Sequence, residues 1–159
     1  MFGSSLGRLV QAYEANPEKR PDLSQDIHFQ LWRSFAGYDS RCSLRTWTYR
    51  IAHNVAATHV IRERRIFSRL VSLDELEFKS VQCDGQGLAN QQLDMERLLS
   101  MVRQLKPLDR QVMLSYLEGL DALSIGDVTG LPPKSVAMRV HRIKNLLAAR
   151  IRKGTNHAR

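Results

Sequence analysis

The stretch that most restricts the fold runs from Ser40 to Arg65 and reads SRCSLRTWTYRIAHNVAATHVIRERR. Ser43 can cap a helix here, because its hydroxyl can accept a hydrogen bond from an unpaired N–H of the first turn. We therefore predict a helix that begins at Ser43 and continues to about Arg62.

This helix has two unlike sides when its residues are placed about 100° apart. One side predicts a core stripe of Leu44, Trp47, Thr48, Ile51, Val55 and Thr58. The other side holds Arg45, Thr46, Tyr49, Arg50, His53 and Ala57, with Asn54 at the border. Basic groups neutralise phosphates, and aromatic faces stack on unpaired bases at roughly 1–3 kcal/mol per base. The second side suits nucleic acid, but a solvated basic face on an ordinary bundle helix has the same pattern.

The net charge narrows the choice of partner. The chain has 159 residues, a formal charge of +8 and 43% hydrophobic residues, with a pI of about 10.0. This favours a polyanionic partner, nucleic acid first and an acidic membrane surface second. No run approaches the roughly 18 apolar residues of a membrane span. The N-terminus lacks a charged-then-apolar signal layout, so we predict a cytoplasmic protein without membrane insertion.

The sequence offers little for catalysis or metal binding. Cys42 and Cys83 are isolated thiols without C-x-x-C spacing, which argues against a disulfide framework or zinc. Cys42 with His53 or His59 could form a thiol nucleophile, but no glycine-rich turn or orienting carboxylate is nearby in sequence. The other histidines, which show no metal-ligand spacing, are His28, His141 and His157. We expect no catalytic residue, no metal and no cofactor.

Two further helices precede the opening stretch. The first spans Leu6 to Glu14, and its predicted buried side consists of Leu6, Leu9, Val10 and Tyr13. The second follows Pro21 and reads DLSQDIHFQLWRSF, with a capping box formed by Asp22 and Gln25. Its buried stripe is predicted as Leu23, Ile27, Leu31 and Phe35. Its other side carries Gln25, Asp26, Phe29, Trp32 and Arg33. Two large aromatic rings there require cover, either from another part of the fold or from another protein.

The character of the chain changes after Arg69. Residues 72–92 are acidic and contain few large apolar side chains, which is typical of a linker. We predict a first domain over residues 1–68, a linker over 69–91, a second domain over 92–153 and a tail over 154–159.

The second domain is predicted to end in a helix-turn-helix. Helices over Leu93–Leu105 and Leu108–Glu118 come first, the second with Pro107 at its start and Gly119 at its end. Ser124 then caps a short helix to Thr129, and Pro133 opens a long helix over Lys134–Lys153. The shared core is predicted as Ile125, Val128, Leu131, Val136 and Val140, with small Gly126 where the helices approach closely.

The long helix is strongly basic, since no Asp or Glu follows Asp127. Five residues in its early turns point away from the apolar stripe and could enter a DNA major groove: Lys134, Ser135, Met138, Arg139 and Arg142. A helical hairpin that is merely basic remains the alternative.

Three segments together resemble the extracytoplasmic-function (ECF) sigma factors of bacterial RNA polymerase: DLSQDIHFQLWRSF, YDSRCSLRTWTYRIAHNVAATHV and SIGDVTGLPPKSVAMRVHRIKNLL. The resemblance implies an all-α fold of two small helical domains joined by a flexible linker. These would be a sigma region 2 bundle and a sigma region 4 helix-turn-helix. It implies binding to core polymerase through the clamp coiled coil and the flap, and to promoter DNA. It also implies an anti-sigma factor as a partner.

The resemblance also assigns roles to residues. The clamp-binding set is Asp22, Gln25, Asp26, Phe29 and Trp32. The set for the −10 element is Tyr38, Arg41, Arg45, Tyr49, Arg50, His53 and Asn54, with Tyr38 and Asn54 around a base flipped from the non-template strand. The set for the −35 element is Lys134, Ser135, Met138, Arg139 and Arg142. Trp47 falls on the core stripe and is interpreted as structural.

The chain departs from the family at three places. Its N-terminal segment is short, and Pro132 and Pro133 replace the usual polar cap of the recognition helix. Ala137 and Met138 stand where polar residues are common, which favours readout of DNA shape with few base contacts. A helix-turn-helix regulator that is not a polymerase subunit is the rival interpretation, although it leaves the Ser40–Arg65 helix and Trp32 without a role.

Overall fold

Helices form all the regular structure in the described parts of the chain, which are residues 3–71 and 90–156 of a computed structural model. Side chains are described within residues 3–68 and 94–152. The α-helices are α1 (Gly3–Tyr13), α2 (Arg20–Ser34), α3 (Leu44–Val71), α4 (Asn90–Arg103), α5 (Pro107–Leu117), α6 (Ala122–Thr129) and α7 (Pro133–Asn156). Most of the expected linker, residues 72–89, lies outside the described residues.

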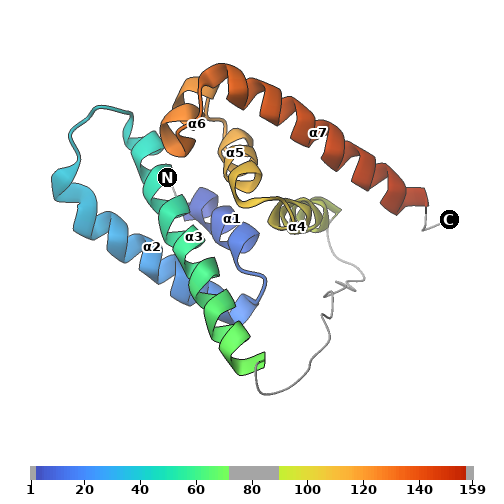
Figure 1. The fold of residues 1–159 in the computed structure, drawn as a ribbon, viewed down its shortest axis with the longest axis horizontal. Coiled ribbons are helices and arrows are strands. Elements are labelled where there is room, and N and C mark those ends of the chain that lie inside the picture. The colour runs from blue at the N-terminus through green and yellow to red at the C-terminus, as the bar shows by residue number, and fades with distance from the viewer. Residues whose placement is uncertain (1–2, 72–89, 157–159) are drawn as a thin grey trace.

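Helices α1 to α3 form the first packed unit (Figure 1), in which α2 and α1 both pack against α3. The predicted buried side of α1 is confirmed, because Leu6, Leu9, Val10 and Tyr13 are all buried. From α2, Leu23 and Ile27 are fully buried. These side chains meet in one apolar cluster, which fixes α2 against the long helix α3.

The start and end of α2 differ from the prediction. The helix begins at Arg20 directly after a 3-10 turn (Pro17–Lys19), so Asp22 lies inside its first turn and cannot act as the N-cap. The expected capping box is therefore wrong. Phe35 is also not a core residue, because the chain enters a second 3-10 turn (Phe35–Gly37) that leaves its ring 60% exposed.

The two sides of α3 were assigned partly wrongly. Ser43 does cap the helix, accepting a hydrogen bond from the Thr46 amide at 3.1 Å. Trp47 and Thr48 are buried as expected, but Leu44 is 41% exposed and Thr58 is exposed. Three residues from the other side of the helix are buried instead: Thr46, Tyr49 and His53. Ala52 and Ala56, which the prediction placed on neither side, are also buried. The reason is that α3 packs against α2, α1 and the second half of the chain, and His53 on its predicted polar side meets both Tyr13 of α1 and Ser115 of α5.

Helices α4 to α7 include the predicted helix-turn-helix. Its core is confirmed: Ile125, Val128, Val136 and Val140 are buried, and Leu131 packs against them. The cap of α6 was wrong, because the carboxylate of Asp121 accepts the Ser124 amide at 2.8 Å and the helix begins at Ala122. Gly126 lies against the turn, where an added Cβ would be 2.7 Å from the Leu131 carbonyl oxygen.

The two halves of the chain, which are α1–α3 and α4–α7, pack against each other. Helix α3 contacts α6 and α5, and α1 contacts α4 (Figure 1). The buried apolar residues of both halves belong to one hydrophobic cluster, which runs from Leu6 through Tyr49 to Leu147. This arrangement decides which of the predicted binding residues face solvent.

Candidate nucleic-acid and protein interfaces

His53 lies in the contact between the halves, with no exposed surface. Its Nδ1 is 2.9 Å from the Tyr13 hydroxyl of α1, and its Nε2 is 3.2 Å from the Ser115 hydroxyl of α5. Burial lowers the pKa of His53 to about 3, so the ring is neutral at physiological pH. The residue therefore joins α1, α3 and α5 through an uncharged hydrogen-bonded chain.

Tyr49 is one turn earlier on α3 and is also buried, with 1% of its surface exposed. Burial raises the pKa of Tyr49, and its hydroxyl has no hydrogen-bond partner among the described residues. A buried hydroxyl without a partner costs free energy, about 1–3 kcal/mol in mutational data. Ser5 and Glu118 also influence the pKa of Tyr49, so polar groups of α1 and of the end of α5 lie near this hydroxyl.

Glu118, just after α5, connects the halves by charge. Its two carboxylate oxygens accept hydrogen bonds from Arg8 of α1 at 2.6 and 2.7 Å. Burial alone would raise the pKa of Glu118, but the hydrogen bonds and charge of Arg8 hold it below its ordinary value. Arg45 of α3 donates to the backbone carbonyl of the same residue. The next residue, Gly119, has a φ of +78°, as a glycine at the end of a helix allows.

The predicted −10 set is thus divided. Arg41, Arg45, Arg50 and Asn54 are exposed, whereas Tyr49 and His53 are buried, with His53 held between Tyr13 of α1 and Ser115 of α5. Tyr38 is half-buried: its hydroxyl donates to the Cys42 carbonyl at 2.7 Å, and its ring lies 5.4 Å from that of Trp47. The predicted structural role of Trp47 is confirmed by its burial.

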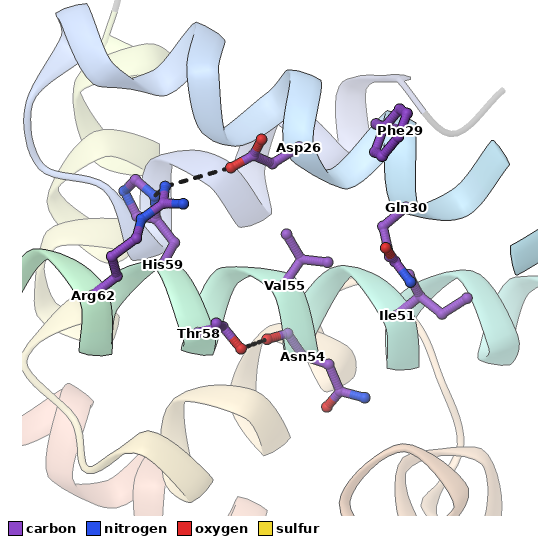
Figure 2. Close-up of a pocket in the computed structure, with 9 residues that line it drawn as sticks. All are labelled: Asp26, Phe29, Gln30, Ile51, Asn54, Val55, Thr58, His59 and Arg62. Atoms are coloured by element: carbon purple, nitrogen blue, oxygen red, sulfur yellow. Dashed lines mark hydrogen bonds and ion pairs between the residues drawn. The ribbon is translucent and has the colours of Figure 1, made fainter. Parts of the chain in front are cut away.

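A groove of about 430 Å³ runs between α2 and α3 (Figure 2). Its lining brings Asp26 and Phe29 of the predicted clamp-binding set together with Asn54 of the predicted −10 set. Arg62 closes one end by an ion pair to Asp26 at 3.5 Å. The side chain of Asn54 points away from α2, and that of Val55 points toward it (Figure 2). The two predicted sets therefore adjoin each other, with Asn54 facing outward.

The exposed face of α2 is apolar at its C-terminal end. Phe29 and Trp32 are 56% and 76% exposed, with ring centroids 6.3 Å apart. No described part of the chain covers them, which confirms that they point away from the buried stripe. Asp22 and Gln25 are exposed on the same helix. A second, larger groove of about 890 Å³ begins beside Trp32, and sequence reasoning missed it because it depends on the exposure of Phe35 and Leu44.

The early turns of α7 present the predicted −35 set on one surface. Lys134, Ser135 and Met138 are exposed, and a shallow hollow of about 320 Å³ is lined by Ser135, Met138, Arg139 and Arg142. The sequence did not single out Asp109, in the first turn of α5, whose carboxylate lies 2.6 Å from Arg139 and 3.5 Å from Arg142. An acidic residue in a first helical turn is common, so its position alone did not suggest this contact.

Within the described residues, no group of three or more His, Cys, Asp and Glu could hold a metal ion. None of the described helices combines the length and apolar character that crossing a bilayer requires.

A helical bundle with an exposed aromatic face, joined to a helix-turn-helix with a basic second helix, defines the class as a two-part DNA-binding protein. Comparison with known families narrows this class. The family model for Sigma-70 region 2 matches residues 2–66, and that for Sigma-70 region 4 matches residues 95–147. The chain therefore belongs to the sigma-70 family and has the two-region composition of an ECF sigma factor.

Individual proteins agree with this assignment. The ECF RNA polymerase sigma factor SigC of Mycobacterium tuberculosis is 27% identical over 141 residues, 87% of this chain and 73% of that protein. SigW of Bacillus subtilis is 22% identical over 96% of this chain and 86% of its own length.

Two solved structures share the fold. CnrH, in complex with the cytosolic domain of CnrY, superposes with a TM-score of 0.67 at 20% identity, covering 96% of this chain and 83% of that one. RpoE of Bartonella quintana, in complex with the anti-sigma factor NepR, gives 0.64 at 17% identity, covering 91% and 89%.

Proposed function

We propose that this chain is an ECF-type sigma factor that binds core RNA polymerase, recognises the −35 and −10 promoter elements and promotes strand opening. The observation that carries the proposal is that both regions of the family occur on one short chain, over residues 2–66 and 95–147. We assign region 2 to residues 1–68, the linker to 69–91, region 4 to 92–153 and a tail to 154–159.

The exposed face of α2 is proposed to bind the clamp coiled coil of the polymerase. Its residues are Asp22, Gln25, Asp26, Phe29 and Trp32. The exposure of Phe29 and Trp32 supports this role, because large aromatic side chains are the common anchors of protein interfaces. The acidic residues on the same face would pair with basic groups at its rim.

The early turns of α7 are proposed to bind the −35 element in the major groove through Lys134, Ser135, Met138, Arg139 and Arg142. The hollow that the last four of these residues share and the excess of cations on α7 support this. Phosphate contacts would provide most of the affinity, and the few side chains that reach base edges would provide the specificity.

The −10 element is proposed to bind along α3 and its preceding loop, through Tyr38, Arg41, Arg45, Tyr49, Arg50, His53 and Asn54. Capturing a flipped base costs a few kcal/mol of unstacking, which stacking and hydrogen bonds in a pocket at Tyr38 and Asn54 would offset. Tyr49 and His53 can reach the strand only after α5 and α6 move away from α3, and His53 must also lose its contact with Tyr13 of α1 or bind through the edge that faces Ser115. The proposed cycle therefore includes separation of the two halves on the polymerase.

An anti-sigma factor is a further proposed partner, because the similar structure of RpoE was determined with the anti-sigma factor NepR bound, and that of CnrH also holds a second protein. We also propose that the chain acts in the bacterial cytoplasm, where promoter DNA and polymerase are found. Sigma factors are not enzymes, and the expectation that this chain catalyses no reaction is consistent with the family.

The rival function is that of a helix-turn-helix regulator that is not a polymerase subunit. In vitro transcription with purified components distinguishes the two functions. Core polymerase alone and core polymerase with this chain are compared in run-off assays on a library of bacterial promoters. The proposal expects initiation from defined start sites only when the chain is present. A regulator would bind DNA without conferring initiation.

The −10 assignment is tested by Asn54→Ala and Tyr38→Ala. Both should weaken promoter opening, measured by permanganate reactivity of unpaired thymines, while the Kd for core polymerase stays the same. Asn145→Ala, which makes the same change at an exposed position of α7, is the matched control for Asn54→Ala. Equal losses of opening and core binding would contradict the pocket.

A further inference from the structure

We propose that Asp109 is a positioning residue for promoter recognition: it orients Arg139 and Arg142 on α7, which increases sequence discrimination while it lowers affinity for DNA in general. The inference rests on the proposed role of α7 at the −35 element. It adds a residue of α5, outside the recognition helix, to the determinants of promoter choice.

The contact is well defined by geometry. Asp109 Oδ1 accepts a hydrogen bond from Arg139 Nη1 at 2.6 Å, and Arg142 Nη2 lies 3.5 Å from both carboxylate oxygens. The Asp109 side chain is 12% exposed and the Arg139 side chain 29%, whereas Arg142 remains 67% exposed. A carboxylate in the first turn of α5 is also stabilised by the positive end of the helix dipole. Asp109 is therefore a fixed, charged anchor behind the surface that α7 presents.

The anchor leaves Arg139 able to bind DNA. A guanidinium has five N–H donors in a planar fork, and the short bond to Asp109 uses one of them. Arg139 also lines the hollow that it shares with Ser135, Met138 and Arg142, so it remains accessible from that side. Fixing a long side chain before binding removes a rotamer entropy cost from the binding step. An arginine that is already oriented discriminates better between base edges than a mobile one, since only the matching geometry gains both hydrogen bonds.

The same carboxylate opposes binding to DNA of any sequence. It neutralises part of the charge of two arginines and repels phosphates that come near α7. Removing the charge should therefore strengthen binding to arbitrary DNA. Removing the anchor should weaken the preference for the correct sequence. These two expectations have opposite signs, which makes the role measurable.

The test uses the full chain assembled with core polymerase. Duplexes enriched by the wild-type holoenzyme from a randomised pool provide the specific probe, and a scrambled version provides the non-specific probe. For Asp109→Asn, we expect equal or tighter binding to the scrambled duplex and a fall of about tenfold in the ratio of the two affinities. Asp127→Asn removes the same charge from an exposed position on α6 and should leave the ratio unchanged.

A double-mutant cycle separates positioning from a general effect on folding. In an Arg139→Ala background, Asp109→Asn should no longer change the affinity ratio, because the residue through which it acts is gone. An unchanged ratio in Asp109→Asn alone, or the same fall in Asp127→Asn, would overturn the inference. Failure of the wild-type holoenzyme to enrich any sequence would instead refute the proposed function, and this inference with it.

Discussion

At the scale of single residues, the contact between the halves depends on polar groups that are buried rather than on apolar ones alone. His53 and Ser115 have no exposed surface, and Tyr49 has almost none. A sequence places such residues on a polar face by default, because it does not show that a second layer of helices covers that face. The predicted set for the −10 element was therefore assembled from residues that the structure divides between solvent and the interface.

The first prediction concerns the pH dependence of stability. Burial holds the pKa of His53 near 3, whereas the exposed ring of an unfolded chain takes up a proton near pH 6.5. The contribution of His53 to the free energy of unfolding is therefore fully present above pH 6.5. It is lost as the pH falls from 6.5 toward 3, with a slope of about 1.4 kcal/mol per pH unit. The groups around the ring are the neutral Tyr13, Tyr49 and Ser115, and the guanidinium of Arg110 lies over the far side of this cluster, on the Tyr13 ring.

Denaturant unfolding at pH 7.5 and pH 5.5 measures this loss. Between pH 7.5 and pH 5.5, the free energy of unfolding of His53→Gln should fall by about 1.4 kcal/mol less than that of the wild type. His28→Gln, at an exposed position, is the matched control and should keep the full dependence. An identical pH dependence in the wild type and in His53→Gln would show that the ring is not buried as a neutral group.

At the scale of elements, the sequence predicted those helices whose pattern faces a single partner. The helix-turn-helix was predicted from Pro133, from the spacing of the apolar residues and from small Gly126. In the structure α7 begins at Pro133, the apolar residues form the core, and Gly126 lies at the close approach. The long helix α3 could not be resolved in the same way, because it packs on two sides and its buried residues form two stripes. The start of α2 was missed because a 3-10 turn leads into it, and Asp22 falls within its first turn.

The second prediction concerns the tight turn after α6. Gly126→Ala should destabilise the chain by about 1–3 kcal/mol, because the added methyl group would be 2.7 Å from the Leu131 carbonyl oxygen. Gly7→Ala, in α1 with open space around its Cβ position, should stabilise it by about 0.5–1 kcal/mol. Thermal unfolding of both variants tests the packing, and a neutral Gly126→Ala would contradict the close approach.

The third prediction concerns α2. Trp32→Ala should weaken binding to core polymerase by at least about tenfold, since an exposed tryptophan at the centre of an interface is a common hot spot. It should change the free energy of unfolding little, because Trp32 is 76% exposed. Phe67→Ala, which removes another exposed ring near the end of α3, is the control. Equal effects of the two changes on binding would remove α2 from the clamp interface.

At the scale of the whole molecule, the described conformation is closed. Glu118 binds Arg8, His53 reaches Ser115, and a guanidinium N–H of Arg103 donates to the Gln11 carbonyl at 2.5 Å. The family predicted two domains, but no sequence pattern indicated that their cores would join, because the joining contacts are between residues more than sixty positions apart. The proposed function requires this closed form to open on the polymerase.

The most direct test of that requirement is the reactivity of His53 toward diethyl pyrocarbonate, which modifies neutral imidazole. The reaction is followed by mass spectrometry in the free chain, in the holoenzyme and in the holoenzyme with promoter DNA, with exposed His141 as the internal reference for the two samples without DNA. We expect no modification of His53 in the free chain, modification of its Nε2 once the polymerase separates Ser115 of α5 from α3, and protection again when DNA is bound. A transcriptionally active holoenzyme in which His53 remains unmodified without DNA would contradict it.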